Sequence, residues 1–340
     1  MRPIFHHKKA FTIVELLIVI VVIAVIAAIS IVSFSGVSQR AIISSFQTDL
    51  TNASKKLEQL KLTNGQYPAS LVSASVVASN SGQFDYSYIN GGTHYCLAEK
   101  NSTGSVIYSV ASPLNQVKVG DCLTNGMYGW WKFNGDALDS SGNGNNGTVF
   151  GATLTTDKNG NANRAYNFVA SSSQYIDLTN AQTMPTEAAT VSLWAKLIDN
   201  TLAQVLIYWG NEYENACGGL PAVSIATCGF IIETDPPGGS ANANGGSSSV
   251  GLPTITSNSW VHIVSLWDSN LGYMKLYING VQSGGTAGLT FRPIFSKGAQ
   301  RIGRPGDTVR YVNGVMDDVR LYYRVLTDSE ITSLYNLGPQ

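Results

Sequence analysis

Hydrophobic and polar residues follow three different patterns along this chain, and each pattern predicts a different kind of structure. Residues 16–29 are aliphatic without interruption. Between residues 42 and 60, apolar residues recur at steps of three and four, which is typical of a helix with one buried face. From residue 128 onward, short apolar stretches alternate with turns rich in Gly, Asn and Ser, which indicates strands.

The first pattern predicts a helix that crosses a membrane once. From Leu16 to about Phe34 the apolar run reaches the roughly 20 residues that a bilayer requires. Arg2, Lys8 and Lys9 precede it and place that end in the cytoplasm. A cleavable secretory signal is the alternative. The apolar run of this chain is longer than the about 7–15 residues usual in such a signal, and a periodic helix follows it directly.

The helix should continue beyond the membrane and then meet a small β-domain. Asn64-Gly65 can cap a helix and Pro68 cannot continue one, so we expect the helix to end near Leu62. Three short strands are expected after it, at residues 84–90, 93–99 and 105–111. They predict an antiparallel meander packed on the amphipathic half of the helix.

Four cysteines, all beyond the apolar helix, favour two disulfide bonds, for which three connectivities exist. We expect Cys96–Cys122 and Cys217–Cys228, because each pair closes a loop within one domain. Free buried thiols are the alternative. There is no CxxC motif and the only His pair precedes the helix, so we do not expect a thiolate metal site.

A single acidic residue, Glu15, stands at the front edge of the aliphatic run. A carboxylate at the bilayer centre costs about 2.5–3.5 kcal/mol on insertion scales, so Glu15 should have a partner. The surrounding stretch, KKAFTIVELL, resembles the class III prepilin signal of type IV pilins. That resemblance rests on the short basic leader, the small residue before Phe11 and the acid five residues into the mature chain.

The resemblance implies cleavage between Ala10 and Phe11 by a prepilin peptidase, followed by N-methylation of Phe11. It also supplies the partner of Glu15, because cleavage creates an α-ammonium group that the carboxylate of an adjacent pilin subunit can meet at low dielectric. An ordinary membrane anchor with an unpaired acid is the alternative.

The predicted fold is an α+β pilin-like domain with a long N-terminal transmembrane helix, followed by an all-β jelly-roll sandwich. The leader is residues 1–10 and the helix is residues 11–62, divided into a transmembrane and assembly part (11–34) and an amphipathic part (35–62). The small β head is residues 63–122, and the sandwich is residues 123–340.

The sandwich resembles the laminin-G-like, concanavalin A-like family over about residues 128–336. The matching stretches follow the family order and include WWKFNGDALDSSGNGNNGT, VSLWAKL, MKLYINGV and GVMDDVRLYYRVLTDSEITSLYN. The resemblance implies a lectin, carbohydrate-binding module or adhesion domain, and in a few members a hydrolase. Asn279-Gly280 predicts a type I′ hairpin turn, and Thr327 with Glu330 predicts a capping box on a short helix.

We do not expect an enzyme. Glucanases of this fold place three acids on one strand as E-x-D-x-E, so that all three face one side. Here Glu233 and Asp235 alone approach that pattern, and the two prolines that follow interrupt the strand.

Calcium is the cofactor that the sequence and the laminin-G resemblance suggest. The oxygen donors that it would use are Asp136, Asp139, Asn143, Asp317 and Asp318. We expect Asp139 and Asp318 as ligands, since Asp317 and Asp318 should point to opposite faces of a strand. The alternative is that DSSGN is simply a turn whose side chains bond their own backbone.

A ligand is expected to meet loops of the sandwich. Trp131 and Trp194 have the alternation of core positions, whereas Trp209 and Tyr213 lie near a stretch that a disulfide would stiffen. Residues 235–251 are a low-complexity loop beside them. A surface loop without binding function is the alternative.

The preferred function is a minor or tip subunit of a type IV pilus that displays a lectin-like domain for attachment to a surface, glycan or protein. Its partners would be other pilin subunits, the prepilin peptidase and membrane lipid, and its location the cytoplasmic (inner) membrane and then the cell surface. A net charge of −1 argues against a nucleic-acid partner. The alternatives are a pseudopilin of a secretion or DNA-uptake machine and a membrane-anchored carbohydrate-active enzyme.

Overall fold

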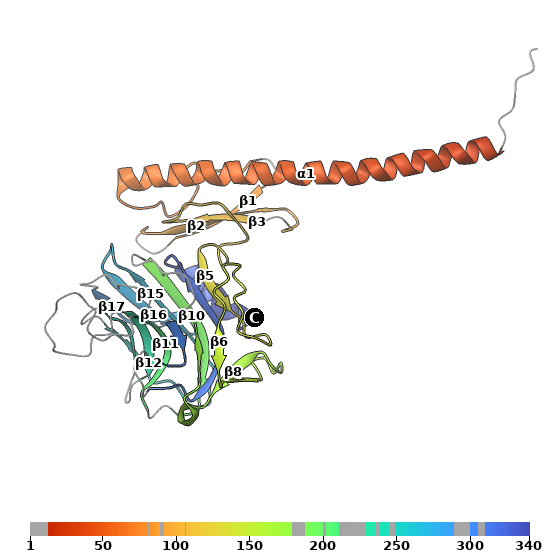
Figure 1. The fold of residues 1–340 in the computed structure, drawn as a ribbon. Coiled ribbons are helices and arrows are strands. Elements are labelled where there is room, and N and C mark those ends of the chain that lie inside the picture. Colours follow the sequence, from red (N-terminus) through yellow and green to blue (C-terminus); the bar gives the residue numbers. More distant parts are fainter. Residues whose placement is uncertain are drawn as a thin grey trace, which may run out of the picture.

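The structure is a computed structural model in which a long helix, a small head sheet and a β-sandwich follow one another (Figure 1). The helix lies along the outer side of the head sheet, and the head sheet lies between the helix and the sandwich. The residues that it describes are 13–79, 82–88, 92–105, 107–178, 188–199, 202–210, 229–234, 239–244, 249–288, 300–304 and 310–340.

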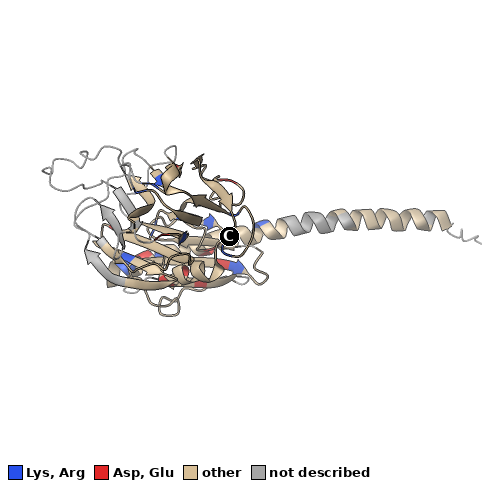
Figure 2. Cartoon of the chain, turned by 90° about the horizontal axis from the view of Figure 1, so that it is seen from below, with Lys and Arg blue, Asp and Glu red and all other residues tan. Residues whose placement is uncertain are grey.

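Helix α1 (Ile13–Asn64) is 52 residues long, or about 78 Å at 1.5 Å per residue. In its first half, the large aliphatic side chains described between Ile13 and Ile29 are 48–83% exposed. In Figure 2 the described residues at the projecting end of this helix are tan, whereas Lys, Arg, Asp and Glu lie around the head and sandwich. Within the part of the chain that the structure describes, no helix meets the length and hydropathy criteria for a bilayer span.

The second half of α1 forms the core of the head. Phe46, Leu50, Ala53 and Leu57, spaced by three and four residues, are at most 4% exposed. The helix ends where the sequence places the cap, at Gly65, whose φ of +76° suits a residue without a side chain. The amide of Gly65 donates to the Lys61 carbonyl at 2.8 Å.

The head sheet is the predicted antiparallel meander. Its strands run in the order β1-β2-β3-β4 and are β1 (Gly82–Tyr88), β2 (Tyr95–Asn101), β3 (Ile107–Ala111) and β4 (Lys118–Val119). Tyr95, Leu97 and Val110 pack against the buried face of α1.

Two antiparallel sheets form the sandwich. One has the order β17-β16-β15-β10-β19-β8-β7, with β5 also paired to β19, and the other has the order β14-β13-β12-β11-β18-β9-β6. The strands are β5 (Met127–Trp131), β6 (Thr148–Phe150), β7 (Thr153–Thr155), β8 (Ala165–Phe168), β9 (Tyr175–Asp177), β10 (Ala188–Leu197), β11 (Gln204–Gly210), β12 (Gly229–Thr234), β13 (Gly239–Asn244), β14 (Ser249–Leu252), β15 (Val261–Asp268), β16 (Tyr273–Ile278), β17 (Val281–Gly288), β18 (Gln300–Ile302) and β19 (Gly314–Tyr322).

Local signals in the sandwich sequence are confirmed. Asn279 and Gly280, which join β16 to β17, both have positive φ, as a type I′ turn requires. Helix α2 (Asp328–Leu337) begins at a complete capping box: Thr327 accepts from the Glu330 amide, and Glu330 accepts from the Thr327 amide. A 3₁₀ turn (Ala170–Ser172) precedes β9.

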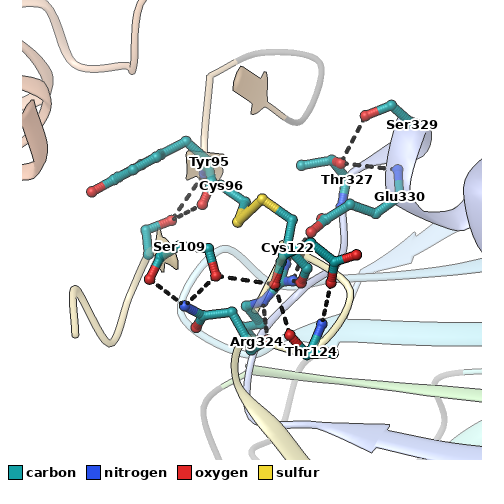
Figure 3. The surroundings of a disulfide bond; sticks show 12 residues. Tyr95, Cys96, Ser109, Cys122, Thr124, Arg324, Thr327, Ser329 and Glu330 are labelled. Atoms are coloured by element: carbon teal, nitrogen blue, oxygen red, sulfur yellow. Dashed lines mark hydrogen bonds and ion pairs between the residues drawn. A yellow bond between two sulfur atoms is a disulfide. The ribbon is translucent and has the colours of Figure 1, made fainter. Parts of the chain in front are cut away.

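A disulfide and a buried arginine join the head to the sandwich (Figure 3). The predicted Cys96–Cys122 bond ties the segment that leaves the head back to β2. The guanidinium of Arg324, which is fully buried, donates to the carbonyls of Cys122 and Asn125 and to both carboxylate oxygens of Glu330. One side chain of the sandwich therefore holds both the exit from the head and the first turn of α2.

Two further contacts cross the same junction. His94 of the head lies 3.1 Å from the carboxylate of Asp268, and both side chains are buried. The Tyr322 hydroxyl donates to the Leu123 carbonyl at 3.0 Å, and Leu123 packs against the apolar cluster beneath α2. The connecting segment is thus bonded to both parts.

A β-bulge in β19 contains one of two adjacent buried acids, Asp318. The register of β10 and β19 shifts between Ser192 and Trp194, and Asp318 in the bulge has a φ of +47°. The prediction that Asp317 and Asp318 point to opposite faces stays a prediction; Asp318 bonds Trp130 and Arg320, whereas Asp157 and Arg164 act on Asp317. Burial first, and then the charge of Asp318, raises the pKa of Asp317 to about 8.

We predict that Arg324→Ala lowers the free energy of unfolding by about 3–5 kcal/mol, because it leaves Glu330 as an unpaired buried charge. The full chain in detergent micelles would be unfolded with denaturant and followed by circular dichroism. Arg40, which is exposed on α1, supplies the control: Arg40→Ala should change the stability by less than about 0.5 kcal/mol. Equal effects of the two variants would contradict the role of the junction.

We predict that Asp317→Asn flattens the pH dependence of stability. The folded protein keeps the Asp317 proton up to about pH 8, whereas the unfolded chain loses it near pH 3.9, roughly its ordinary pKa. Stability contributed by this group therefore falls as the pH rises through that window and is constant outside it.

At pH 8 the Asn variant should be more stable than the original protein by at least about 1.4 kcal/mol, the equivalent of one pKa unit. The exposed Asp136 gives the control Asp136→Asn, which should keep the original pH profile. Parallel profiles for the Asp317→Asn variant and the original protein would refute the assignment.

Candidate functional site

The N-terminal processing site lies at the edge of the described chain. Ala10 and Phe11 fall outside the described residues, and so does the side chain of Glu15, although its backbone is part of α1. What is described next to them is the uncovered apolar half of α1. An exposed apolar surface of this extent marks a site of contact with a membrane or with other protein chains.

Both predicted calcium ligands are engaged by protein donors. The Asp139 carboxylate accepts hydrogen bonds from the backbone amides of Trp130, Ser141 and Asn145, at 2.8–2.9 Å. The Asp318 carboxylate accepts two bonds from the Arg320 guanidinium, at 3.0 and 2.9 Å, and one from the Trp130 indole at 2.6 Å. Trp130 thus lies between the two acids.

This set of contacts does not fit a calcium ion. Calcium needs six to eight oxygen ligands with open lone pairs, roughly 2.3–2.6 Å away. Here the amides around Asp139 shape a turn, and the cationic Arg320 already occupies the carboxylate of Asp318, which is 3% exposed. We therefore derive no role for calcium from Asp139 and Asp318.

Trp209, which the sequence suggested as a ligand contact, is a core residue in the structure. It is 1% exposed in β11 and packs edge-to-face on Tyr128, with ring centroids 5.3 Å apart. No face of its ring is open to a ligand. Tyr213 and the predicted Cys217–Cys228 bond lie outside the described residues, as does most of the loop at residues 235–251.

A different aromatic group does reach the surface of the sandwich. Phe150 in β6 pairs with Tyr175 in β9, and their rings stack 4.6 Å apart and nearly parallel. The Arg304 guanidinium lies 4.7 Å from the ring of Tyr175 and 5.4 Å from that of Tyr311. We call these four residues the aromatic ladder.

The aromatic ladder has the properties of a stacking surface. Phe150 is 45% exposed, so its ring is open to solvent over much of its area. Asp177 and Arg301 lie on neighbouring strands and add charged groups beside the ladder. The Nε atom of Arg301 is 3.8 Å from the carboxylate of Asp177. Aromatic faces carry partial negative charge and attract the slightly positive C–H groups of a flat ligand such as a sugar ring.

Sequence reasoning missed the ladder because its strands are only three residues long. Neither TVF at residues 148–150 nor YID at residues 175–177 shows a face by alternation. The pairing of Phe150 with Tyr175 follows from the sheet order, which places β6 beside β9.

A pocket of about 340 Å³ also opens on the head, lined by Thr51, Ser54, Lys55, Glu58, Gln59, Leu62 and Asn115. Its acid is engaged: Glu58 accepts from the Tyr67 hydroxyl and from the Asn115 amide, which ties α1 to the head. The acidic residue of this pocket therefore has a structural role, and we do not treat the pocket as a functional site.

Comparison with known protein families finds two matches in this chain. Residues 5–31 match the prokaryotic N-terminal methylation motif, and residues 170–332 match the concanavalin A-like lectin/glucanase superfamily. No match to a curated protein is found.

Solved structures are similar to part of this chain. Domain 4 of an extracellular arabinanase from Geobacillus stearothermophilus, in complex with arabinotriose, aligns with 61% of this chain and 97% of its own, with 21% identity and a TM-score of 0.43. The ligand binding domain of botulinum neurotoxin serotype D, in complex with N-acetylneuraminic acid, aligns with 63% of this chain and 51% of its own, with 16% identity and a TM-score of 0.47.

The methylation-motif match includes the start of α1, and the superfamily match lies in the sandwich, which Arg324 joins to the head. This chain therefore combines, in one polypeptide, a match to the prokaryotic N-terminal methylation motif and a match to the concanavalin A-like lectin/glucanase superfamily.

Proposed function

We propose that this protein is a pilin-like subunit that assembles through α1 and displays its sandwich for attachment to a glycan-bearing surface. The observation that carries the proposal is the combination, in one continuous chain, of a methylation motif on an uncovered apolar helix with a lectin-like domain bonded to the head. An apolar helix surface of this length needs lipid or other helices around it.

The proposed route begins in the cytoplasmic membrane, where the apolar half of α1 inserts and a prepilin peptidase cleaves between Ala10 and Phe11. Glu15 then pairs with the methylated α-ammonium group of Phe11 on an adjacent pilin subunit, because each charge removes the cost of burying the other. The subunit leaves the membrane as it enters a filament at the cell surface.

The sandwich supports a minor or tip position in that filament. The sandwich is larger than the head that it is bonded to, and dense helical packing leaves little room for such bulk. The same architecture in a secretion or DNA-uptake pseudopilus would bring the sandwich into contact with cargo instead.

We propose binding rather than catalysis for the sandwich, with the aromatic ladder as the contact surface. The acid pattern of glucanases is incomplete around Glu233, which lies in β12. The ladder offers an exposed ring with charged neighbours, which suits recognition of a sugar face and its hydroxyl groups.

We predict that Glu15→Ala reduces the amount of assembled filament by at least about tenfold, which corresponds to 1.4 kcal/mol of lost pairing. Filaments sheared from cells expressing the full chain would be quantified by immunoblot and electron microscopy, and mass spectrometry of their N-terminal peptide should show methylated Phe11.

The matched control is Gln47→Ala, which removes an exposed side chain from the part of α1 outside the assembly region and should leave the amount of filament unchanged. Unchanged assembly of the Glu15→Ala variant, or a mature chain that keeps Met1, would refute the pilin proposal. Label restricted to filament ends supports the tip position. Loss of secretion with normal attachment in a deletion strain would favour the pseudopilus.

We predict that Phe150→Ala and Tyr175→Ala each weaken glycan binding by at least about fivefold, the equivalent of 1 kcal/mol for one stacked ring. The full chain in detergent would be screened against immobilised oligosaccharides, and the affinity of each variant measured for the best binder.

Trp260, a half-exposed aromatic residue outside the ladder, gives the control Trp260→Ala. Retained affinity in both ladder variants would exclude the ladder as the binding surface, while glycan binding by the original protein would still support the attachment function.

A further inference from the structure

Four oxygen-bearing side chains from three segments of the head come together beside α1. Ser45 and Asp49 lie one turn apart on α1, Ser79 follows the helix–sheet connection, and Glu99 lies in β2. The hydroxyls of Ser45 and Ser79 are 2.7 Å apart, and the Ser79 amide donates to Asp49 at 2.9 Å. The Asp49 carboxylate also faces Glu99 closely enough to act on its charge.

Glu99 is buried beside another acid. Its exposed fraction is 0%, and no amide, hydroxyl or cationic group among the described residues donates to its carboxylate. Burial first, and then the Asp49 carboxyl group through its charge and a side-chain hydrogen bond, raises the pKa of Glu99. No described Lys or Arg forms an ion pair with Asp49 or Glu99 either. A buried carboxylate in this state costs several kcal/mol unless a positive charge meets it.

The backbone of β1 is shaped around this carboxylate. A Cβ atom at Gly82 would lie 1.9 Å from Glu99 Oε1 and 2.7 Å from its Cδ, so any other residue at position 82 would displace the acid. Gly82 is not one of the described glycines with a positive φ, so its backbone conformation does not require a glycine. The space that it leaves is filled by the Glu99 carboxylate.

We propose that Ser45, Asp49, Ser79 and Glu99 form a binding site for one divalent cation of the calcium type. Two carboxylates and two hydroxyls are hard oxygen donors, and water can complete the six to eight ligands that calcium takes. Glu99 forms the buried wall of the site, whereas Ser45 and Asp49 are half-buried and leave a route from solvent.

A cation at this site would hold α1, the connection that ends at Ser79, and β2 together. These are the contacts that seat the head on the helix, so binding should stabilise the head as a unit. The site is separate from Asp139 and Asp318, which lie in the sandwich, and from the aromatic ladder. It does not depend on the proposed attachment function.

The test uses the full chain in detergent micelles at pH 8.5, after removal of metal by a chelator. That pH lies above the pKa of Glu99, which burial and then Asp49 raise to about 8. Calcium chloride would be titrated by calorimetry, and the melting temperature measured with and without it. We expect one site with half-saturation at about 0.1–1 mM, the range of extracellular calcium modules, and a melting temperature that rises with calcium.

Glu99→Gln and Asp49→Asn should each abolish the heat and the rise in melting temperature. Asp85, an exposed acid on β1, gives the control Asp85→Asn, which should keep both. If Glu99→Gln fails to fold, the half-exposed Asp49→Asn decides the test.

Three results would overturn the proposal. The original protein could show neither heat nor a melting shift. It could respond in the same way as both site variants, which would place the ion elsewhere. Finally, the Glu99→Gln variant could change only the pH dependence of melting while calcium has no effect, which would show that the two acids share a proton and bind no metal.

Discussion

The buried guanidinium of Arg324 is the interaction on which the arrangement of this protein depends. It bonds two carbonyls of the segment that leaves the head and the acid that caps α2, and the Cys96–Cys122 bond fixes the same segment to β2. A charge buried in this way is tolerated only while all its partners stay in place. The sandwich is therefore displayed in one orientation relative to the head, not on a flexible tether.

That constraint links the two ends of the molecule. In the proposed assembly the apolar half of α1 is covered by lipid or by other helices, while its second half packs against the head sheet. With the sandwich bonded to the head, the position of α1 in an assembly also determines where the sandwich faces. A protein that attaches through the sandwich would benefit from this, because force on the sandwich passes through bonded contacts to α1.

Buried and half-buried acids in this chain have different kinds of partner. Asp139 and Asp318 are met by amides and by Arg320, and Asp317 keeps a proton because burial and Asp318 disfavour its charge. Glu99 has no basic partner among the described residues, its neighbour is another acid, Asp49, and its carboxylate fills the space that Gly82 leaves. Glu99 differs from the other acids because no positive group of the described protein neutralises it. A proton or a bound cation would have to do so.

Much of the architecture could be predicted from the sequence, because the signals involved are local. The spacing of Phe46, Leu50 and Leu57 determines the buried face of α1, Asn279-Gly280 determines its hairpin, and Thr327 with Glu330 determines where α2 begins. Only the tertiary structure decided which side chains are accessible. Trp209 is enclosed by the core, Asp318 is bonded to Arg320 and Trp130, and Phe150 meets Tyr175 only through the order of strands. These outcomes depend on contacts between residues far apart in the chain, whose free energies no local pattern records.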